Sequence, residues 1–148
     1  MPSQDSVAAF VDALAMATSG FRTFMRQQLK AVDLDLTAEM LQVLRYLWAH
    51  DGVNQQEIAN AVNKDKATLT SMLDNLVRRG LVQRQEDSQD RRSKRIRLTS
   101  KGWALEQQIA PMMDKMYAVA GLNLSAGQLR ESITLLKQIA DNLDHQKE

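Results

Sequence analysis

One stretch decides the fold of this chain: Asp65–Gly102, with the sequence DKATLTSMLDNLVRRGLVQRQEDSQDRRSKRIRLTSKG. In its first part, apolar residues recur three and four positions apart, which is the spacing of one buried helical face. Asp65 can cap the start of this helix, and Gly80 can end it. The period then shortens to two, so we expect strands at 81–86 and 95–99 around a charged tip. The stretch therefore predicts a helix followed by a β-hairpin.

A second, shorter helix is expected just before this stretch. Asn54 and Glu57 have the spacing of a capping box, with Asn in place of the usual Ser or Thr, and an apolar face follows them. Two short helices joined by a tight turn, the second leading into a basic hairpin, have the order of a winged helix-turn-helix. In that arrangement the second helix fits the major groove of DNA while the first helix braces it. The sequence therefore predicts a DNA-reading lobe over about 37–99.

Helices are also predicted on both sides of this lobe. The periodicity and capping signals indicate helices from about Ser6 to Leu29, from Thr37 to a turn near Gly52, from Thr99 or Ser100 to about Val119 with a kink at Pro111, and from Ser125 onward. The fold class is thus mainly α with a small β-hairpin wing, in a single domain spanning 1–148. The flanking segments, about 6–30 and 100–146, carry apolar stripes that one small core cannot cover, so we expect them to form a homodimer.

Charge is distributed unevenly along the chain. Between Arg78 and Lys101 there are nine basic and three acidic residues, a net charge of +6, whereas the rest has ten basic and fifteen acidic residues, a net charge of −5. A concentrated positive segment on an acidic body indicates a surface that binds a polyanion. Two alternatives are a solvated charged loop and a winged helix that serves as a protein-interaction module without DNA binding, its basic wing meeting an acidic partner.

The composition argues against several other functions. The chain has no Cys and two His, so disulfides, thiol catalysis and a His-rich metal site are not expected. We find no glycine-rich phosphate loop and no convincing pair of nucleophile and base, so no catalytic residue, cofactor or metal is assigned and an enzyme is not expected. No apolar run approaches the roughly 20 residues that span a bilayer, and no secretory signal is seen, which favours a cytoplasmic protein without a membrane partner.

The chain resembles the MarR (multiple-antibiotic-resistance regulator) family of winged helix-turn-helix transcriptional regulators. Thr68-Leu69-Thr70 and Gly80-Leu81-Val82 match the family's recognition helix and its exit, and Asp90-Arg91-Arg92 with Leu98-Thr99 match its wing. The resemblance implies a homodimer that binds a palindromic site in double-stranded DNA. Because the two recognition helices are related by a two-fold axis, the half-sites are expected about one helical turn apart.

The predicted DNA contacts fall into groups with different roles. They are Asn54, Gln55, Ala67, Thr68, Ser71 and Asn75 on the two helices, Lys64, Lys66, Arg78 and Arg84 for phosphates, and Arg91, Arg92, Lys94 and Arg95 on the wing. Ser71 and Asn75 stand where many members of the family carry arginines, so the base contacts are expected to differ from the family's usual ones. Asp90 is expected to brace the wing by pairing with an arginine, because phosphate repels a carboxylate.

The resemblance also implies control by a ligand. In relatives, small aromatic or phenolic acids often bind between the dimer helices and the DNA-reading lobe, so the chain is predicted to be a repressor that such a ligand relieves. The residues expected to line this site are Phe24, Met25, Met40, Tyr46 and Met112, with Arg26, Arg45 or His50 receiving a carboxylate. The alternative for these three cationic or imidazole side chains is a solvent-facing position without a ligand.

Overall fold

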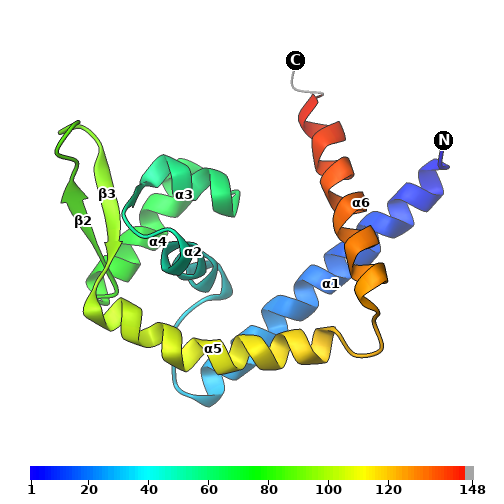
Figure 1. Ribbon diagram of the computed structural model, residues 1–148, viewed down its shortest axis with the longest axis horizontal. Helices are drawn as coiled ribbons and strands as arrows, with labels where there is room; N and C mark the ends of the chain where they lie inside the picture. The colour runs from blue at the N-terminus through cyan, green and yellow to red at the C-terminus, as the bar shows by residue number, and fades with distance from the viewer. Residues whose placement is uncertain (146–148) are drawn as a thin grey trace. The chain divides into compact units, whose positions relative to one another are not determined.

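The computed structural model describes residues 1–145 (Figure 1). In chain order the elements are α1 (Gln4–Ala31), α2 (Ala38–Ala49), β1 (Val53–Asn54), α3 (Gln55–Val62), α4 (Lys66–Arg78), β2 (Val82–Glu86), β3 (Lys94–Leu98), α5 (Ser100–Ala120) and α6 (Ala126–Asp144). The predicted class, mainly α with a small β-hairpin wing, is confirmed. Every helix expected from the sequence forms, with ends that differ from the expected ones by a few residues at most.

The chain divides into two compact units, which are described separately. The first comprises Met1–Met113 and the second begins at Asp114, so the division falls inside α5. The lobe predicted over about 37–99 lies wholly within the first unit, together with α1. The second unit contains the end of α5 and α6. The predicted end of the last flanking segment, residue 146, lies outside the described residues.

The helices begin at the residues that the sequence marks as caps. The side chains of Thr37 and Asp65 accept hydrogen bonds from backbone N–H groups in the first turns of α2 and α4. Capping boxes form at Asn54 and at Ser125. These bonds satisfy N–H groups that have no partner inside the helix, so they define where each helix starts. The predicted starts of α2, α3, α4 and α6 are confirmed.

Positive backbone angles follow two of the helices. Gly80, with φ of +70°, comes just after α4, and Gly52, with φ of +76°, lies in the turn after α2. Glycine adopts this conformation without the steric cost that a Cβ brings, so both glycines suit a helix end. By contrast, α5 runs through Pro111 to Ala120, so the proline does not end the helix.

The wing belongs to a three-stranded antiparallel sheet and is not an isolated hairpin. The strand order is β1-β3-β2, with Val53 opposite Ile96 and Val82 opposite Leu98. The sequence did not predict β1, because a strand of two residues is too short to show an alternating pattern. β1 leads directly into α3, so it attaches the wing to the helix-turn-helix.

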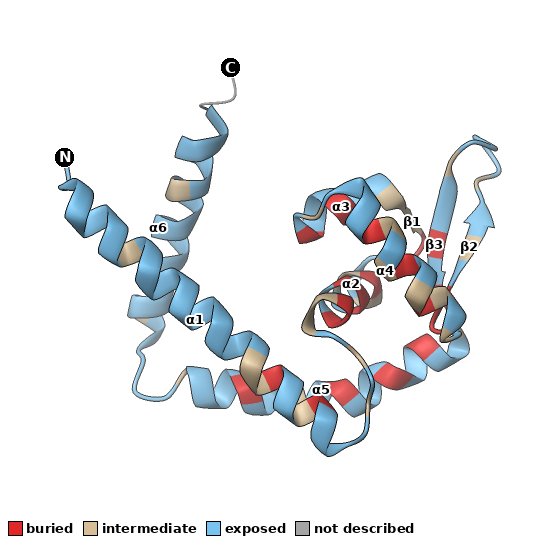
Figure 2. Cartoon of the chain, turned by 180° about the vertical axis from the view of Figure 1, so that it is seen from behind, coloured by how far each residue is buried: buried red, intermediate tan, exposed pale blue. Residues whose placement is uncertain are grey.

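The core of the first unit lies among the helix-turn-helix, the lower part of α1, the sheet and the start of α5 (Figure 2). Its most completely buried side chains are Leu29, Val43, Leu44, Leu47, Ile58, Leu69, Leu73, Leu76, Val82, Ile96 and Ile109. Burying an aliphatic side chain of this size contributes roughly 1.5–3 kcal/mol. Because three of these leucines come from α4, the core holds that helix with its polar face outward.

Other apolar side chains lie on the surface of the single chain. Along Ala126–Asp144, α6 has no buried residue (Figure 2). Exposed apolar side chains include Val7, Val11, Leu14 and Phe21 in α1, and Leu129, Ile133, Leu136 and Leu143 in α6. These side chains leave apolar faces of α1 and α6 exposed to water in the single chain.

Within the described part of the chain, no helix combines the length and the apolar character that crossing a membrane requires.

Candidate nucleic-acid interface

The recognition helix α4 presents a small and polar outer face. Its cap, Asp65, accepts hydrogen bonds from the Thr68 hydroxyl at 2.7 Å and from the Thr68 backbone N–H at 2.8 Å. The hydroxyl first, and the amide second, lower the pKa of the Asp65 carboxyl, so it is ionised at neutral pH beside the positive end of the helix dipole. Lys66, Ala67, Thr68, Ser71 and Arg78, all predicted DNA contacts, are exposed.

Asn75 contacts a neighbouring arginine. It is half-buried, and its Oδ1 accepts a hydrogen bond from Arg79 Nε at 2.7 Å. Arg79 also donates to the backbone oxygen of Asp35 and forms an ion pair with its carboxylate, with 3.2 Å between Nη2 and Oδ2. Asn75 thus links the end of α4 to the segment before α2. Its contact with bases stays a prediction.

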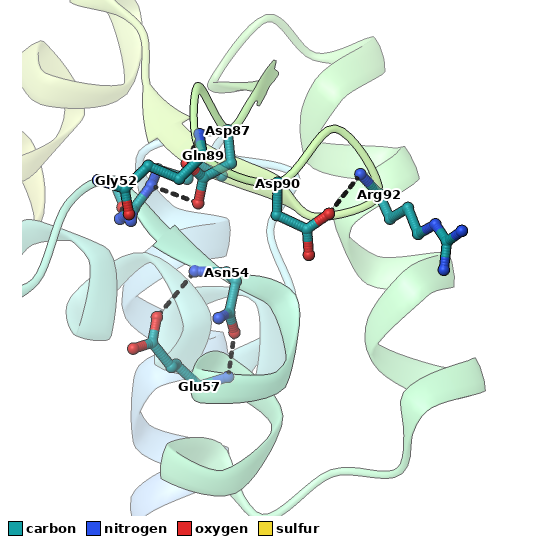
Figure 3. Close-up of polar contacts among 8 residues, drawn as sticks. Gly52, Asn54, Glu57, Asp87, Gln89, Asp90 and Arg92 are labelled. Carbon is teal, nitrogen blue, oxygen red and sulfur yellow. Dashed lines mark hydrogen bonds and ion pairs between the residues drawn. The ribbon is translucent and has the colours of Figure 1, made fainter.

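The first helix of the motif braces the second through side chains. Gln55 Nε2 donates to Thr70 Oγ1, and the Thr70 hydroxyl lies 2.8 Å from the Lys66 carbonyl oxygen. In the capping box, Asn54 Oδ1 accepts from Glu57 N and Glu57 Oε2 accepts from Asn54 N, both at 2.9 Å (Figure 3). Asn54 and Gln55, predicted as DNA contacts, therefore also hold the helix-turn-helix together.

A groove of about 380 Å³ lies between the helix-turn-helix and the wing. The residues that line it are Asn54, Gln55, Gln56, Ala59, Lys66, Arg84, Arg92, Ser93, Lys94 and Ile96. Four of these side chains are cationic and none is acidic, so the groove attracts a negatively charged backbone. Most of the groove's polar residues were predicted DNA contacts. The other predicted cations, Lys64, Arg78, Arg91 and Arg95, lie outside its lining.

Carboxylate and backbone contacts shape the tip of the wing (Figure 3). Asp87 Oδ1 accepts from Gln89 N at 3.0 Å, and Asp90 Oδ1 accepts from Arg92 N at 2.9 Å. The Asp90 carbonyl oxygen also accepts from Ser93 N at 3.1 Å. The sequence predicts an arginine side chain as the partner of Asp90, whereas this bond goes to the backbone of Arg92. The Arg92 guanidinium extends away from the loop (Figure 3).

The arginines of the sheet and wing divide into two groups. Three form ion pairs: Arg84 with Asp74 at 2.7 Å, Arg95 with Asp87 at 3.2 Å, and Arg97 with Asp51 at 3.9 Å. Arg95 also donates to the Gly52 carbonyl oxygen at 2.7 Å, so it ties the wing to the turn before β1. Within residues 1–145, the exposed cations Arg91, Arg92 and Lys94 form no ion pair, which leaves them available for phosphate.

Asp51 offers a test of how the wing is anchored. Its Oδ1 accepts from the buried Leu98 N–H at 2.8 Å, so Asp51→Ala leaves that donor without this partner. We expect the free energy of unfolding to fall by about 1–3 kcal/mol, measured by urea denaturation. Asp51→Asn is the matched control, because it keeps an acceptor oxygen and removes only the long ion pair with Arg97. Equal losses in both variants would contradict the role of the hydrogen bond.

The residues predicted to line a ligand site lie in different environments. Met25 and Met40 are core residues, 4% and 6% exposed, and Tyr46 stacks on His50 with ring centroids 4.7 Å apart. Phe24 and Met112 are half-buried, and Arg45 is exposed. Arg26 lines a pocket of about 370 Å³ together with Leu29, Lys30, Asp33, Leu34, Asp35 and Leu36. The proposed binding of a carboxylate by Arg26, Arg45 or His50 stays a prediction.

Sequence reasoning missed residues that organise this interface. Asp51, Thr70 and Arg79 each bind a partner from another part of the chain, and Asp74 of α4 pairs with Arg84 of β2. Asp51 and Leu98 are 47 positions apart, so no periodic pattern could reveal their contact.

The helix-turn-helix, the cationic groove and the wing together define a winged helix-turn-helix protein with a face suited to nucleic acid. Residues 36–94 match the model of the MarR family. The resemblance found in the sequence is therefore confirmed over 36–94, the segment that carries the helix-turn-helix, β2 and the tip of the wing.

Three solved structures show how far the similarity extends. MepR of S. aureus, in a complex with DNA, is 28% identical, with a TM-score of 0.81 over 90% of this chain and 97% of MepR. BpsR of Bordetella bronchiseptica, whose DNA binding is regulated by 6-hydroxynicotinic acid, is 23% identical, with a TM-score of 0.78 over 89% of this chain and 98% of BpsR. PcaV of Streptomyces coelicolor, in complex with its natural ligand, is 23% identical, with a TM-score of 0.80 over 95% and 98%. At 23% identity, the last two comparisons support a shared fold and nothing finer.

Proposed function

We propose that this chain is a homodimeric transcriptional repressor that binds a palindromic site in double-stranded DNA and is released by a small aromatic or phenolic acid. The observation that carries the DNA-binding part is the groove with four cations beside the exposed outer face of α4. Small and polar side chains can approach base edges, while nearby cations bind phosphates. MepR, which has the same fold and is seen with DNA, supports this use of the winged helix.

The roles within the interface follow from the exposure and partners of each residue. Thr68 and Ser71, exposed on the first turns of α4, are assigned to sequence preference. Lys66 and Lys94 are assigned to phosphates, and Arg92 to the minor groove or the phosphates that flank it. In this proposal the lobe over about 37–99 reads DNA, and the helices on both sides of it form the dimer.

DNA selection tests this function directly. Purified protein is incubated with a random duplex pool, and the retained sequences are expected to converge on a palindrome with half-sites about one helical turn apart. A winged helix used only as a protein-interaction module would enrich no sequence and would bind all duplexes equally weakly. Enrichment of a non-palindromic site would agree with the DNA-binding function but would contradict the symmetric dimer.

The exposed stripe of α6 supports the homodimer. Leu129, Ile133 and Leu136 recur at helical spacing and are 45%, 52% and 38% exposed in the single chain. A stripe of this length is costly to leave in water and is typical of a protein interface. A second copy of the chain is the partner that we propose, because a two-fold dimer matches two recognition helices to a palindrome.

A charge placed in this stripe is expected to break the dimer. Ile133→Glu buries a carboxylate among apolar side chains, so the dissociation constant should rise at least tenfold, measured by sedimentation velocity at micromolar concentration. Gln138→Glu is the control, because residue 138 lies on the opposite, polar side of α6 and is expected to leave the dimer intact. A wild-type chain that sediments only as a monomer would contradict the homodimer.

Control by a small acid is a separate part of the proposal. Arg26 lines a pocket with three leucines and with Lys30, Asp33 and Asp35, and BpsR supplies a case in which an aromatic acid regulates a protein of this fold. A ligand that binds the DNA-free dimer more tightly than the DNA-bound dimer must weaken DNA binding, by an amount set by the difference between these two affinities. Coupling of roughly 1–3 kcal/mol corresponds to about 5- to 150-fold weaker binding.

Titration of salicylate into the protein–DNA complex measures this coupling. We expect weaker DNA binding as salicylate increases, and no change with salicylamide, which lacks the carboxylate. Binding of salicylate to the free protein without any effect on DNA affinity would show that it is not an effector. No binding by any of a series of aromatic acids would contradict the ligand assignment and leave the DNA-binding proposal intact.

A further inference from the structure

Arg84, which the sequence predicts to contact phosphate, forms an ion pair with Asp74 of α4. Arg84 Nη2 and Asp74 Oδ1 are 2.7 Å apart. This ion pair joins α4 to β2, and the Arg84 side chain is 25% exposed while that of Asp74 is 54% exposed. Asp74 follows Ser71 by three positions, so its carboxylate lies on the same outer face as the residues proposed to read bases.

The position of Asp74 is unusual for a surface that binds DNA. Arg84 lines the cationic groove with Lys66, Arg92 and Lys94, and of these four it is the one that forms an ion pair with another described residue. The carboxylate cancels the charge of Arg84 and repels phosphates that approach α4. A stronger cationic surface was available to this chain by placing a neutral residue at position 74, so the acid weakens attraction to the DNA backbone.

We propose that Asp74 is a specificity-determining residue: it withholds the charge of Arg84 from the phosphate backbone and so keeps binding to unselected DNA weak. Binding to unselected duplexes is almost entirely electrostatic, and the protein can slide until any free cation meets a phosphate. At the preferred sequence, base contacts fix the register, so a freed Arg84 gains a phosphate only if one lies within its reach. Removing the carboxylate therefore strengthens non-specific binding more than specific binding. The inference rests on the proposed DNA-binding function.

The experiment compares two duplexes of equal length: one selected from a random pool by the wild-type protein, and one scrambled to the same composition. For Asp74→Asn, we expect about fivefold tighter binding to the scrambled duplex and at most twofold tighter binding to the selected one. The slope of log affinity against log salt for the scrambled duplex should steepen by about one unit, the value for one added phosphate contact. Fluorescence anisotropy at several salt concentrations measures all of these quantities.

Two further variants separate this role from the alternatives. Glu106→Gln removes one negative charge from an exposed position in α5 outside the groove. This variant is expected to bind both duplexes with the affinity of the wild-type protein. Arg84→Gln breaks the same ion pair but leaves the Asp74 carboxylate without its cation, so the carboxylate repels phosphates and binding to the scrambled duplex is expected to weaken. The two variants are thus expected to change the affinity for the scrambled duplex in opposite directions. A pair that only braced α4 against β2 would weaken binding in both variants.

Each other outcome overturns the inference. If Asp74→Asn and Arg84→Gln both weaken binding, with lower thermal midpoints, the pair is only a brace. If Glu106→Gln acts like Asp74→Asn, net charge explains the effect and Asp74 has no special position. If wild-type protein binds DNA and Asp74→Asn binds both duplexes with unchanged affinity, the inference alone fails. If wild-type protein binds neither the pool nor the scrambled duplex even at low salt, the proposed function fails as well.

Discussion

Replacing Gly102 by alanine is expected to lower the free energy of unfolding by about 3 kcal/mol. Gly102 is buried in the first turn of α5, and a Cβ there would lie 2.1 Å from the carbonyl oxygen of Leu81. This backbone oxygen already accepts a hydrogen bond from Thr99 N at 3.1 Å, so it cannot move aside as a flexible side chain would. The Gly102 carbonyl accepts from Trp48 Nε1 at 3.0 Å, so a shift of α5 would also disturb α2.

The loss should appear in urea denaturation and as a thermal midpoint lower by roughly 10 °C. Gly20→Ala is the matched control, because Gly20 lies inside α1 and an added Cβ has no atom within 4 Å. Alanine is a better helix former than glycine by about 1 kcal/mol, so this control is expected to be as stable as the wild-type chain or slightly more stable. Equal stability of the two variants would contradict the close approach of α5 to Leu81.

The helix starts could be predicted from the sequence because their signals are local. Thr37, Asp65 and Ser125 each accept from a backbone N–H three positions ahead, so the cap and its target lie in one short window. The apolar face of α4 is local in the same sense, since its leucines recur within four turns of helix. These features depend on neighbouring residues and not on how distant segments pack.

The parts that could not be predicted depend on contacts between distant segments. β1 has two residues and exists because Val53 and Asn54 pair with β3, more than 40 positions later. Arg79 reaches the segment before α2, which is 44 positions earlier. No local pattern encodes such pairings, because they arise when the core brings the elements together.

The candidate site shows the same division. Sequence alone could place Lys66, Arg92 and Lys94 on a helix start and a wing, and the structure brings all three into one groove. Sequence reasoning favoured Arg92 as the wing contact but could not show which partners hold the arginines of this basic segment. Their partners separate them: Arg95 is held by Asp87 and the Gly52 carbonyl, whereas the Arg92 guanidinium extends from the tip.

Arg92→Ala is expected to weaken binding to duplex DNA about tenfold, or about 1.4 kcal/mol, at fixed salt. The Arg92 side chain is exposed, lines the groove and forms no ion pair within residues 1–145. Because it is the Arg92 backbone N–H that binds Asp90, alanine keeps this bond and the shape of the tip. The salt slope should fall by about one unit if the guanidinium neutralises one phosphate.

Two variants make the result specific to Arg92. Arg97→Ala removes the same charge from β3, but that arginine already pairs with Asp51 and does not line the groove, so its effect should be small. Arg92→Lys keeps the charge and loses the planar fork of donors, so it should have the salt slope of the wild-type protein. If Arg92 reads a narrow minor groove, lysine should recover only part of the affinity that alanine loses. Full recovery by lysine would assign Arg92 to a phosphate. Unchanged affinity and salt slope in Arg92→Ala would show that this residue is not part of the DNA interface. The wing contact would then be assigned to Arg91 or Lys94, the neighbouring cations that also lack ion pairs in the described chain.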